Sequence, residues 1–416
     1  MPIVSDAADQ PQLSPSQRRR AYSAIFTGVA VSTTGFLASN TVNSLIAEDL
    51  TGSASWSGLP AAASVLGTAV GATALAVVVR RVGPRLGLTL GYALATVAIA
   101  TAAYAILARD FALFVASLFV FGVGYGSNRL ARYVAADLYP VAERGTMIGW
   151  IVWASTIGAV AGPALLAPAR ELAGWIQVDG LVGPYLVGIL ATVLSGAAML
   201  AAPRRLDDRV QTAASHQTGP ARSIGALLGE APVTLALVAM VSGQFVMVLL
   251  MTMTPVHIRH EGHGLGAIGL VISAHTLGMF ALSPITGKLA DRFGRVPLLA
   301  GGVGVLVVAC LVGVAAAWRS SYPMLLVSLL LLGVGWNLGF VGGSALLTDR
   351  VSPRDRSRVQ GFGDSLIWGG GAIASIASGW MLERTGFAVL SMIGAVLALA
   401  PVVPLWRLRG GSRADP

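Results

Sequence analysis

The sequence has little charge and few reactive side chains. Of its 416 residues only 11% are Asp, Glu, Lys or Arg, against about 25% in an ordinary soluble domain. The single cysteine, Cys310, excludes an intrachain disulfide and a Cys-x-x-Cys metal or redox motif. The single lysine, Lys288, is followed by Leu289 rather than Ser or Thr, so no P-loop can be written. Neither HExxH nor GxSxG occurs. We therefore expect neither an enzyme nor a prosthetic group.

Apolar residues fill the length of the chain instead. They make up 55% of it, and the mean hydropathy is +0.74. About 20 apolar residues span a bilayer as a helix, and the runs lack the alternation of a membrane β-barrel. The pattern predicts an all-α integral membrane protein with twelve transmembrane helices, at 22–47, 55–79, 87–107, 111–136, 146–167, 181–202, 231–256, 267–287, 297–317, 324–347, 359–382 and 387–406.

The net charge of +9 is distributed as in a membrane protein rather than a nucleic-acid-binding one. With the N-terminus cytoplasmic, 21 of the 28 basic residues fall in cytoplasmic segments. Arg129 and Arg132 lie inside the fourth span, and five basic residues fall on the opposite side: Arg109, Arg170, Arg259, Arg319 and Arg384. This bias predicts a multi-pass membrane protein with both termini cytoplasmic, in contact with lipid and not with nucleic acid. We expect a monomer.

An internal repeat divides the chain. Several residues of the first half recur 211 positions later: Arg81, Gly83 and Gly122-x-Gly124 correspond to Arg292, Gly294 and Gly333-x-Gly335. An offset near half the chain length indicates duplicated six-helix units. We predict an N-terminal half at 1–202, a cytoplasmic linker at 203–230 and a C-terminal half at 231–416, with the substrate path between the halves.

The segment from Gly287 to Arg295, Gly-Lys-Leu-Ala-Asp-Arg-Phe-Gly-Arg, resembles the signature loop of the major facilitator superfamily. The resemblance covers the whole chain when the twelve spans and the repeat are included. It implies a transporter that works by alternating access, with a conformational latch formed by five residues: Gly287, Asp291, Arg292, Gly294 and Arg295. In the first half Arg80 stands where the pattern has Asp, so the equivalent charge pair is in doubt.

The fifth span carries Gly149-x8-Gly158-x3-Gly162-Pro163. This run resembles the antiporter signature of drug-exporting members of the superfamily, although Leu166-Ala167 replace its terminal glycine pair. Glycines on one stripe also let a neighbouring helix approach closely, and proline kinks a helix. The pattern therefore indicates either packing geometry or an exporter.

Two pairs of soft ligands occupy consecutive spans. Met247 and Met251 form MxxxM in the seventh span, and His275 and Met279 form HxxxM in the eighth. A spacing of four residues puts each pair on one helical face. Thioethers with one imidazole favour Cu(I), and none carries a fixed charge that would be costly in a membrane. The alternative is that the methionines are flexible lipid- or core-facing filler and that His275 is a hydrogen-bonded helix histidine.

This arrangement resembles the CcoA-like copper importers of the superfamily, where the same two motifs occur on the same two helices. The resemblance implies that Met247, Met251, His275 and Met279 bind copper as the transported ion. The loop outside the seventh span holds His257, His260, Glu261 and His263, which would gather metal at the outer mouth or form a solvated polar loop.

Polar residues inside spans are further candidates. Asp364 would carry a coupling proton or pair with Arg356 or Arg358 near the cytoplasmic surface. Arg129 would bind an anionic substrate or extend to the cytoplasmic surface. Asn337 would be a cavity polar group beside the close-packing glycines of the tenth span. The resemblance favours copper uptake across a bacterial cytoplasmic membrane, with proton-coupled export of drugs or hydrophobic metabolites as the alternative.

Overall fold

The computed structural model describes residues 13–209, 223–351 and 353–411. Within these ranges every regular element is a helix. The first group of elements is α1 (Pro15–Thr41), α2 (Asn43–Thr51), η1 (Ala54–Trp56), α3 (Leu59–Val82), α4 (Pro84–Leu107), α5 (Phe111–Asp137), α6 (Val141–Ala164), α7 (Leu166–Trp175), α8 (Gly183–Leu200) and η2 (Arg204–Arg209). The second is α9 (Ile224–Leu228), α10 (Ala231–His260), α11 (Leu265–Phe280), α12 (Ser283–Phe293), α13 (Arg295–Trp318), α14 (Tyr322–Arg350), α15 (Pro353–Ala398) and α16 (Val402–Gly411).

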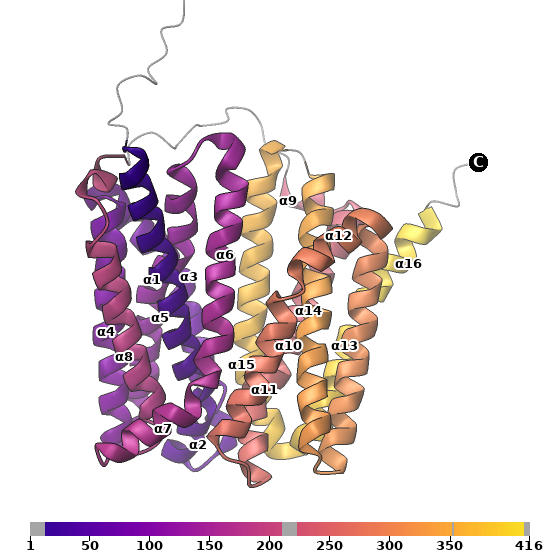
Figure 1. Cartoon of the computed structure of the whole chain (residues 1–416). Coiled ribbons are helices and arrows are strands. Elements are labelled where there is room, and N and C mark those ends of the chain that lie inside the picture. Colours follow the sequence, from indigo (N-terminus) through magenta and orange to yellow (C-terminus); the bar gives the residue numbers. More distant parts are fainter. Residues whose placement is uncertain (1–12, 210–222, 352, 412–416) are drawn as a thin grey trace, which may run out of the picture.

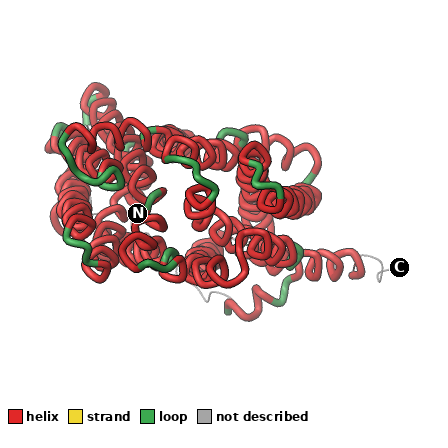
Figure 2. Tube along the Cα trace, turned by 90° about the horizontal axis from the view of Figure 1, so that it is seen from below, coloured by secondary structure: helices red, strands yellow, loops and turns green. Residues whose placement is uncertain are grey.

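Two bundles stand side by side (Figures 1 and 2). In the first, α1 packs against α6 and α8, and α5 against α3 and α4. In the second, α14 packs against α10, α11 and α13, and α15 against α10 and α13. Contacts of α6 with α11 and of α3 with α15 join the bundles. In Figure 1 the start of α1, α9 and α16 lie at one end, and α2 and α7 at the opposite end. The charge bias predicts that the latter end is external, and we call it the outer end.

The helices have the length and composition of membrane spans. Within the residues that the structure describes, ten stretches are long and apolar enough to cross a bilayer. One of them, Phe362–Trp406, has 45 residues and contains the non-helical Gly386, whose φ of 76° breaks the long helix α15. It therefore holds the two spans predicted at 359–382 and 387–406. Large apolar side chains such as Val97, Ile373 and Val396 are more than 60% exposed on the bundle surface, where lipid would cover them. The all-helical fold predicted from the sequence is confirmed.

The internal repeat of the sequence is also visible in the backbone conformation of two equivalent glycines. Gly83, between α3 and α4, has φ 89° and ψ 160°, and Gly294, between α12 and α13, has φ 91° and ψ 159°. Residues with a side chain rarely adopt such a φ. The same glycine turn therefore joins corresponding helices in the two bundles, at the offset of 211 residues found in the sequence.

Candidate functional site

The predicted copper ligands lie on two helices that share a neighbour. Met247 and Met251 are on α10, and His275 and Met279 are on α11. Met247, His275 and Met279 are buried, and Met251 is partly buried. α10 packs chiefly against α14 and α15, whereas α11 packs chiefly against α14 and α6. Both Met/His pairs thus belong to the apolar interior of the second bundle.

His275 is held by α14. Its Nδ1 lies 2.8 Å from the carbonyl oxygen of Leu329, and since a carbonyl oxygen only accepts, Nδ1 carries the proton. In the neutral ring Nε2 then has a free lone pair, and it is buried without a hydrogen-bond partner among the residues that the structure describes. The backbones also meet here, because a Cβ added at Gly333 would lie 2.2 Å from the His275 carbonyl oxygen. The buried lone pair is the strongest local support for a soft metal ligand.

The outer histidines point to three different partners. His257 stacks on Phe387 with ring centroids 4.4 Å apart. His260 contacts Glu48 across the two bundles, and His263 lies 5.0 Å from the Tyr322 ring. Glu261, the fourth residue of this set, is exposed. Among the residues that the structure describes, no three His, Cys, Asp or Glu side chains are grouped so that they could hold a metal ion.

A second candidate site lies between the bundles. The Arg129 guanidinium of α5 lies 4.1 Å from the ring centroid of Trp368 on α15. Arg129 therefore points toward the other bundle rather than toward the cytoplasmic surface. Asp364, one turn before Trp368, is exposed and lies within electrostatic reach of Arg129 and Arg132. Residues 356 and 358, its predicted partners, have no described side chains.

Aromatic and amide side chains continue this site into the second bundle. The indole N–H of Trp336 donates to the Gln244 side-chain oxygen at 2.8 Å, and Trp336 stacks on Phe340 with centroids 4.7 Å apart. A Cβ added at Gly371, one turn from Trp368, would lie 3.4 Å from Gln244 Nε2. We call five of these residues the central set: Arg129, Gln244, Trp336, Phe340 and Trp368. Arg129 and Gln244 can be recognised in the sequence as polar residues within spans, whereas aromatic stacking leaves no spacing signature.

Asn337 fulfils a packing role. It is buried, and its Nδ2 donates to the Met279 carbonyl at 2.6 Å and to the Ser283 hydroxyl at 2.7 Å. Its oxygen accepts from Thr286 at 2.6 Å. These bonds hold α14 against α11 and α12, so the structure places the predicted cavity residue inside the second bundle.

The glycines of the fifth span pack against α1. A Cβ at Gly158 would lie 2.5 Å from the Ala30 carbonyl oxygen, and one at Gly162 would lie 2.5 Å from the Thr34 carbonyl oxygen. Since proline has no N–H, Pro163 leaves the Ala159 carbonyl without its helical donor. The Thr276 hydroxyl of α11 donates to that carbonyl at 3.0 Å. Gly158, Gly162 and Pro163 therefore serve helix packing and one contact between the bundles, as the packing interpretation predicts.

The predicted latch is a chain of ion pairs. Arg295 Nη1 lies 2.6 Å from Asp291, and Arg295 Nε lies 3.1 Å from Asp349 on α14. Arg292 lies over the Phe293 ring at 5.3 Å. Gly294 is required by its positive φ, but no atom of the described residues lies within 4 Å of a Cβ added at Gly287. Close helix approach, expected of both glycines, is therefore not the reason for glycine at 287.

The first bundle has an acidic partner at the equivalent turn. Asp207 of η2 accepts hydrogen bonds from the backbone N–H groups of Arg85 and Leu86, at 2.7 and 3.3 Å. It thereby caps the first turn of α4, where a negative charge is favourable. Asp207 could not be predicted as a partner of this turn, because it is 122 positions from Arg85 and no local pattern connects the two.

We expect Asp291→Asn to slow transport about two- to fivefold without changing substrate preference. Asp291 is 75% exposed, and exposed pairs contribute about 0.2–1 kcal/mol. The substitution shifts the balance of inward- and outward-open states and leaves the central set intact. Initial transport rates for two competing substrates would check it, and a changed ratio between the substrates would contradict the latch role.

Comparisons with known proteins agree with this fold. The chain matches the Major Facilitator Superfamily over residues 25–268 and 235–415. It is 35% identical over 404 residues to the uncharacterized MFS-type transporter YddS of Bacillus subtilis, covering 93% of this chain and 89% of the relative. It is 29% identical to the riboflavin transporter RfnT of Brucella anthropi, covering 83% and 85%. The crystal structure of a D-xylose-proton symporter superposes with a TM-score of 0.75 at 16% identity, covering 94% and 98%.

The chain is a multi-pass membrane protein built as a secondary transporter. It belongs to the Major Facilitator Superfamily. These comparisons establish the superfamily and do not extend to the resemblance to CcoA-like copper importers.

Proposed function

We propose that the protein transports a planar organic solute that carries an aromatic ring system. The observation that supports this most directly is the central set, in which a guanidinium lies on an indole across the two bundles and an amide holds a second, stacked indole in the second bundle. Indole faces stack on flat rings, and each such contact contributes about 0.5–1.5 kcal/mol beyond burial. Arg129 adds hydrogen-bond donors for ring carbonyls or an anionic group. Gln244 is buried, and its side-chain oxygen orients Trp336.

The similarity to RfnT also supports an aromatic solute. Its name describes a transporter of riboflavin, a flat heteroaromatic compound, and the similarity extends over most of both chains. We therefore choose riboflavin as the first compound to test. An aromatic organic solute agrees with the predicted alternative of drugs or hydrophobic metabolites rather than with copper.

The test is transport of radiolabelled riboflavin by the protein in proteoliposomes. We expect Trp336→Leu and Arg129→Gln each to lower transport at limiting substrate about five- to tenfold, because one stacking or cation–π contact is lost. Trp318→Leu is the matched control, since Trp318 is 72% exposed at the end of α13. Equal transport by Trp336→Leu and Trp318→Leu would contradict the role of the central set.

Copper remains the second candidate, on the strength of the free Nε2 lone pair of His275. Met247, Met251 and Met279 would supply thioethers to the transported ion. In cells supplied with radiolabelled copper, this hypothesis expects a Met247→Leu, His275→Leu double variant to lose accumulation. Met392→Leu, at a methionine that is 44% exposed, is the control. Normal copper accumulation in the double variant would exclude the copper site.

A further inference from the structure

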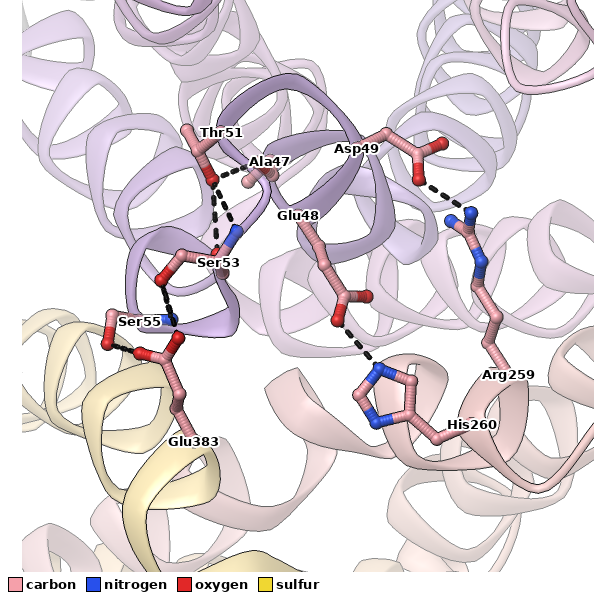
Figure 3. A network of polar contacts seen from close by, with 9 residues as sticks. All are labelled: Ala47, Glu48, Asp49, Thr51, Ser53, Ser55, Arg259, His260 and Glu383. Atoms are coloured by element: carbon pink, nitrogen blue, oxygen red, sulfur yellow. Dashed lines mark hydrogen bonds and ion pairs between the residues drawn. The ribbon is translucent and has the colours of Figure 1, made fainter.

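The outer end is closed by side chains that reach from one bundle to the other (Figure 3). Arg259 Nη2 lies 2.5 Å from the Asp49 carboxylate, and His260 Nε2 lies 2.7 Å from the Glu48 carboxylate. The Glu383 carboxylate accepts hydrogen bonds from Ser53, at 2.8 Å, and from Ser55. Three carboxylates thus connect α2 and η1 with α10 and α15, and we call these contacts the outer closure.

Helix ends explain why these residues attract one another. Glu48 and Asp49 lie in the last turn of α2, where the helix dipole disfavours negative charge. Arg259 and His260 lie in the last turn of α10, where the dipole favours positive charge. A positive group from the other bundle therefore stabilises Glu48 and Asp49 more at this helix end than it would in the middle of a helix. When the bundles separate at this end, the acidic pair loses that cation.

The two ion pairs differ in their dependence on pH. Arg259 stays charged at all ordinary pH values, whereas imidazole changes charge between about pH 5 and 8. A carboxylate only accepts, so His260 Nε2 donates to Glu48 whether the ring is neutral or protonated. The charged ring makes the stronger hydrogen bond. The His260 side chain is 55% exposed, so protons from the outer solution reach it.

We infer that the Glu48–His260 pair is an external proton-binding site that stabilises the outward-closed conformation. The closed conformation places a carboxylate against the ring and the open conformation removes it. Binding of a proton and closure of the outer end must then promote one another, because linkage is reciprocal. Acid outside favours closure, and alkali outside favours opening. The interaction free energy of one exposed ion pair corresponds to a change of about two- to fivefold in the closed-to-open ratio.

Other charged groups surround the pair and must be held constant in a test. Those on or next to α2, α10 and α15 are Asp49, Arg109, His257, Arg259, Glu261, His263 and Glu383. Arg109 donates to the Asp49 backbone carbonyl at 2.8 Å. None of these is altered in the variants below, so their titration contributes equally to every protein compared.

The experiment measures the opening of the outer end directly, without substrate. Nitroxide labels are placed at Trp175→Cys and Trp318→Cys in a Cys310→Ala background. Trp175 is 81% exposed on α7 in the first bundle, and Trp318 is 72% exposed on α13 in the second. Distance distributions by pulsed electron paramagnetic resonance, in lipid nanodiscs at pH 5.5 and pH 8, give the closed-to-open ratio.

With native Glu48 and His260, we expect the ratio to fall about two- to fivefold from pH 5.5 to pH 8. His260→Gln and Glu48→Gln should each reduce that response to the part that the unaltered groups contribute, and the double variant should behave as either single one. His260→Arg should keep the high ratio at both pH values. An unchanged pH response in both single variants would overturn the inference, as would a low ratio in His260→Arg. Because no substrate is present, the outcome is independent of the proposed organic solute.

Discussion

Transport is expected to stop when the outer end is tied shut. In a Cys310→Ala background, Asp49→Cys and Arg259→Cys place two thiols where an ion pair now joins the bundles at 2.5 Å. A short bismaleimide that links them should abolish transport, because alternating access requires these bundles to separate at this end. The measurement is solute flux before and after linking, with the link verified by mass spectrometry.

The matched control is a link within one bundle. Arg170→Cys and Gly180→Cys lie in contact at the outer end of the first bundle, where a Cβ at Gly180 would lie 2.9 Å from the Arg170 side chain. Linking these positions should leave most of the flux intact. Full flux through the Asp49–Arg259 link would mean that the closure does not have to open during transport.

Loss of the folded protein is expected for Gly333→Leu. The new side chain would start 2.2 Å from the His275 carbonyl oxygen, so α11 and α14 would have to move apart. Overpacking of this kind costs about 1–3 kcal/mol or more. Thermal unfolding of the detergent-solubilised protein and its monodisperse yield would report the effect.

Gly301→Leu gives the comparison, since nothing lies within 4 Å of a Cβ added at Gly301 on α13. Leucine is also a better helix former than glycine, by nearly 1 kcal/mol. We expect this variant to unfold at the same temperature as the native protein or above it. An unchanged unfolding temperature for Gly333→Leu would contradict the close approach of α11 and α14.

Local and repeated features could be predicted from the sequence. Apolar runs gave the spans because a bilayer demands a fixed helical length. The repeat predicted that Gly83 and Gly294 occupy equivalent positions in the two halves, and their φ values of 89° and 91° agree with this. The break near Gly386 was also expected, since glycine accepts a positive φ. Each of these signals is carried by residues that are close together in the chain.

Partners far apart in the chain could not be predicted. Glu48 meets His260 across 212 positions, and Asp207 meets the start of α4 across more than 120. The main neighbours of the two helices that carry the Met/His pairs could not be predicted either: α10 packs chiefly against α14 and α15, and α11 chiefly against α14 and α6. A short connection fixes where the next helix begins, and packing of all the helices decides which face it turns inward.

The Thr276 hydroxyl bears on how easily the bundles exchange positions. Besides the Ala159 carbonyl of the other bundle, it lies 3.1 Å from the Ile272 carbonyl and 3.0 Å from the Ser273 carbonyl of its own helix. When the bundles separate, the hydroxyl proton can turn to one of these without passing through an unbonded state. Only the Ala159 oxygen then needs a water molecule. The contact can thus be broken and remade many times at little enthalpic penalty, as a carrier with a repeating cycle requires.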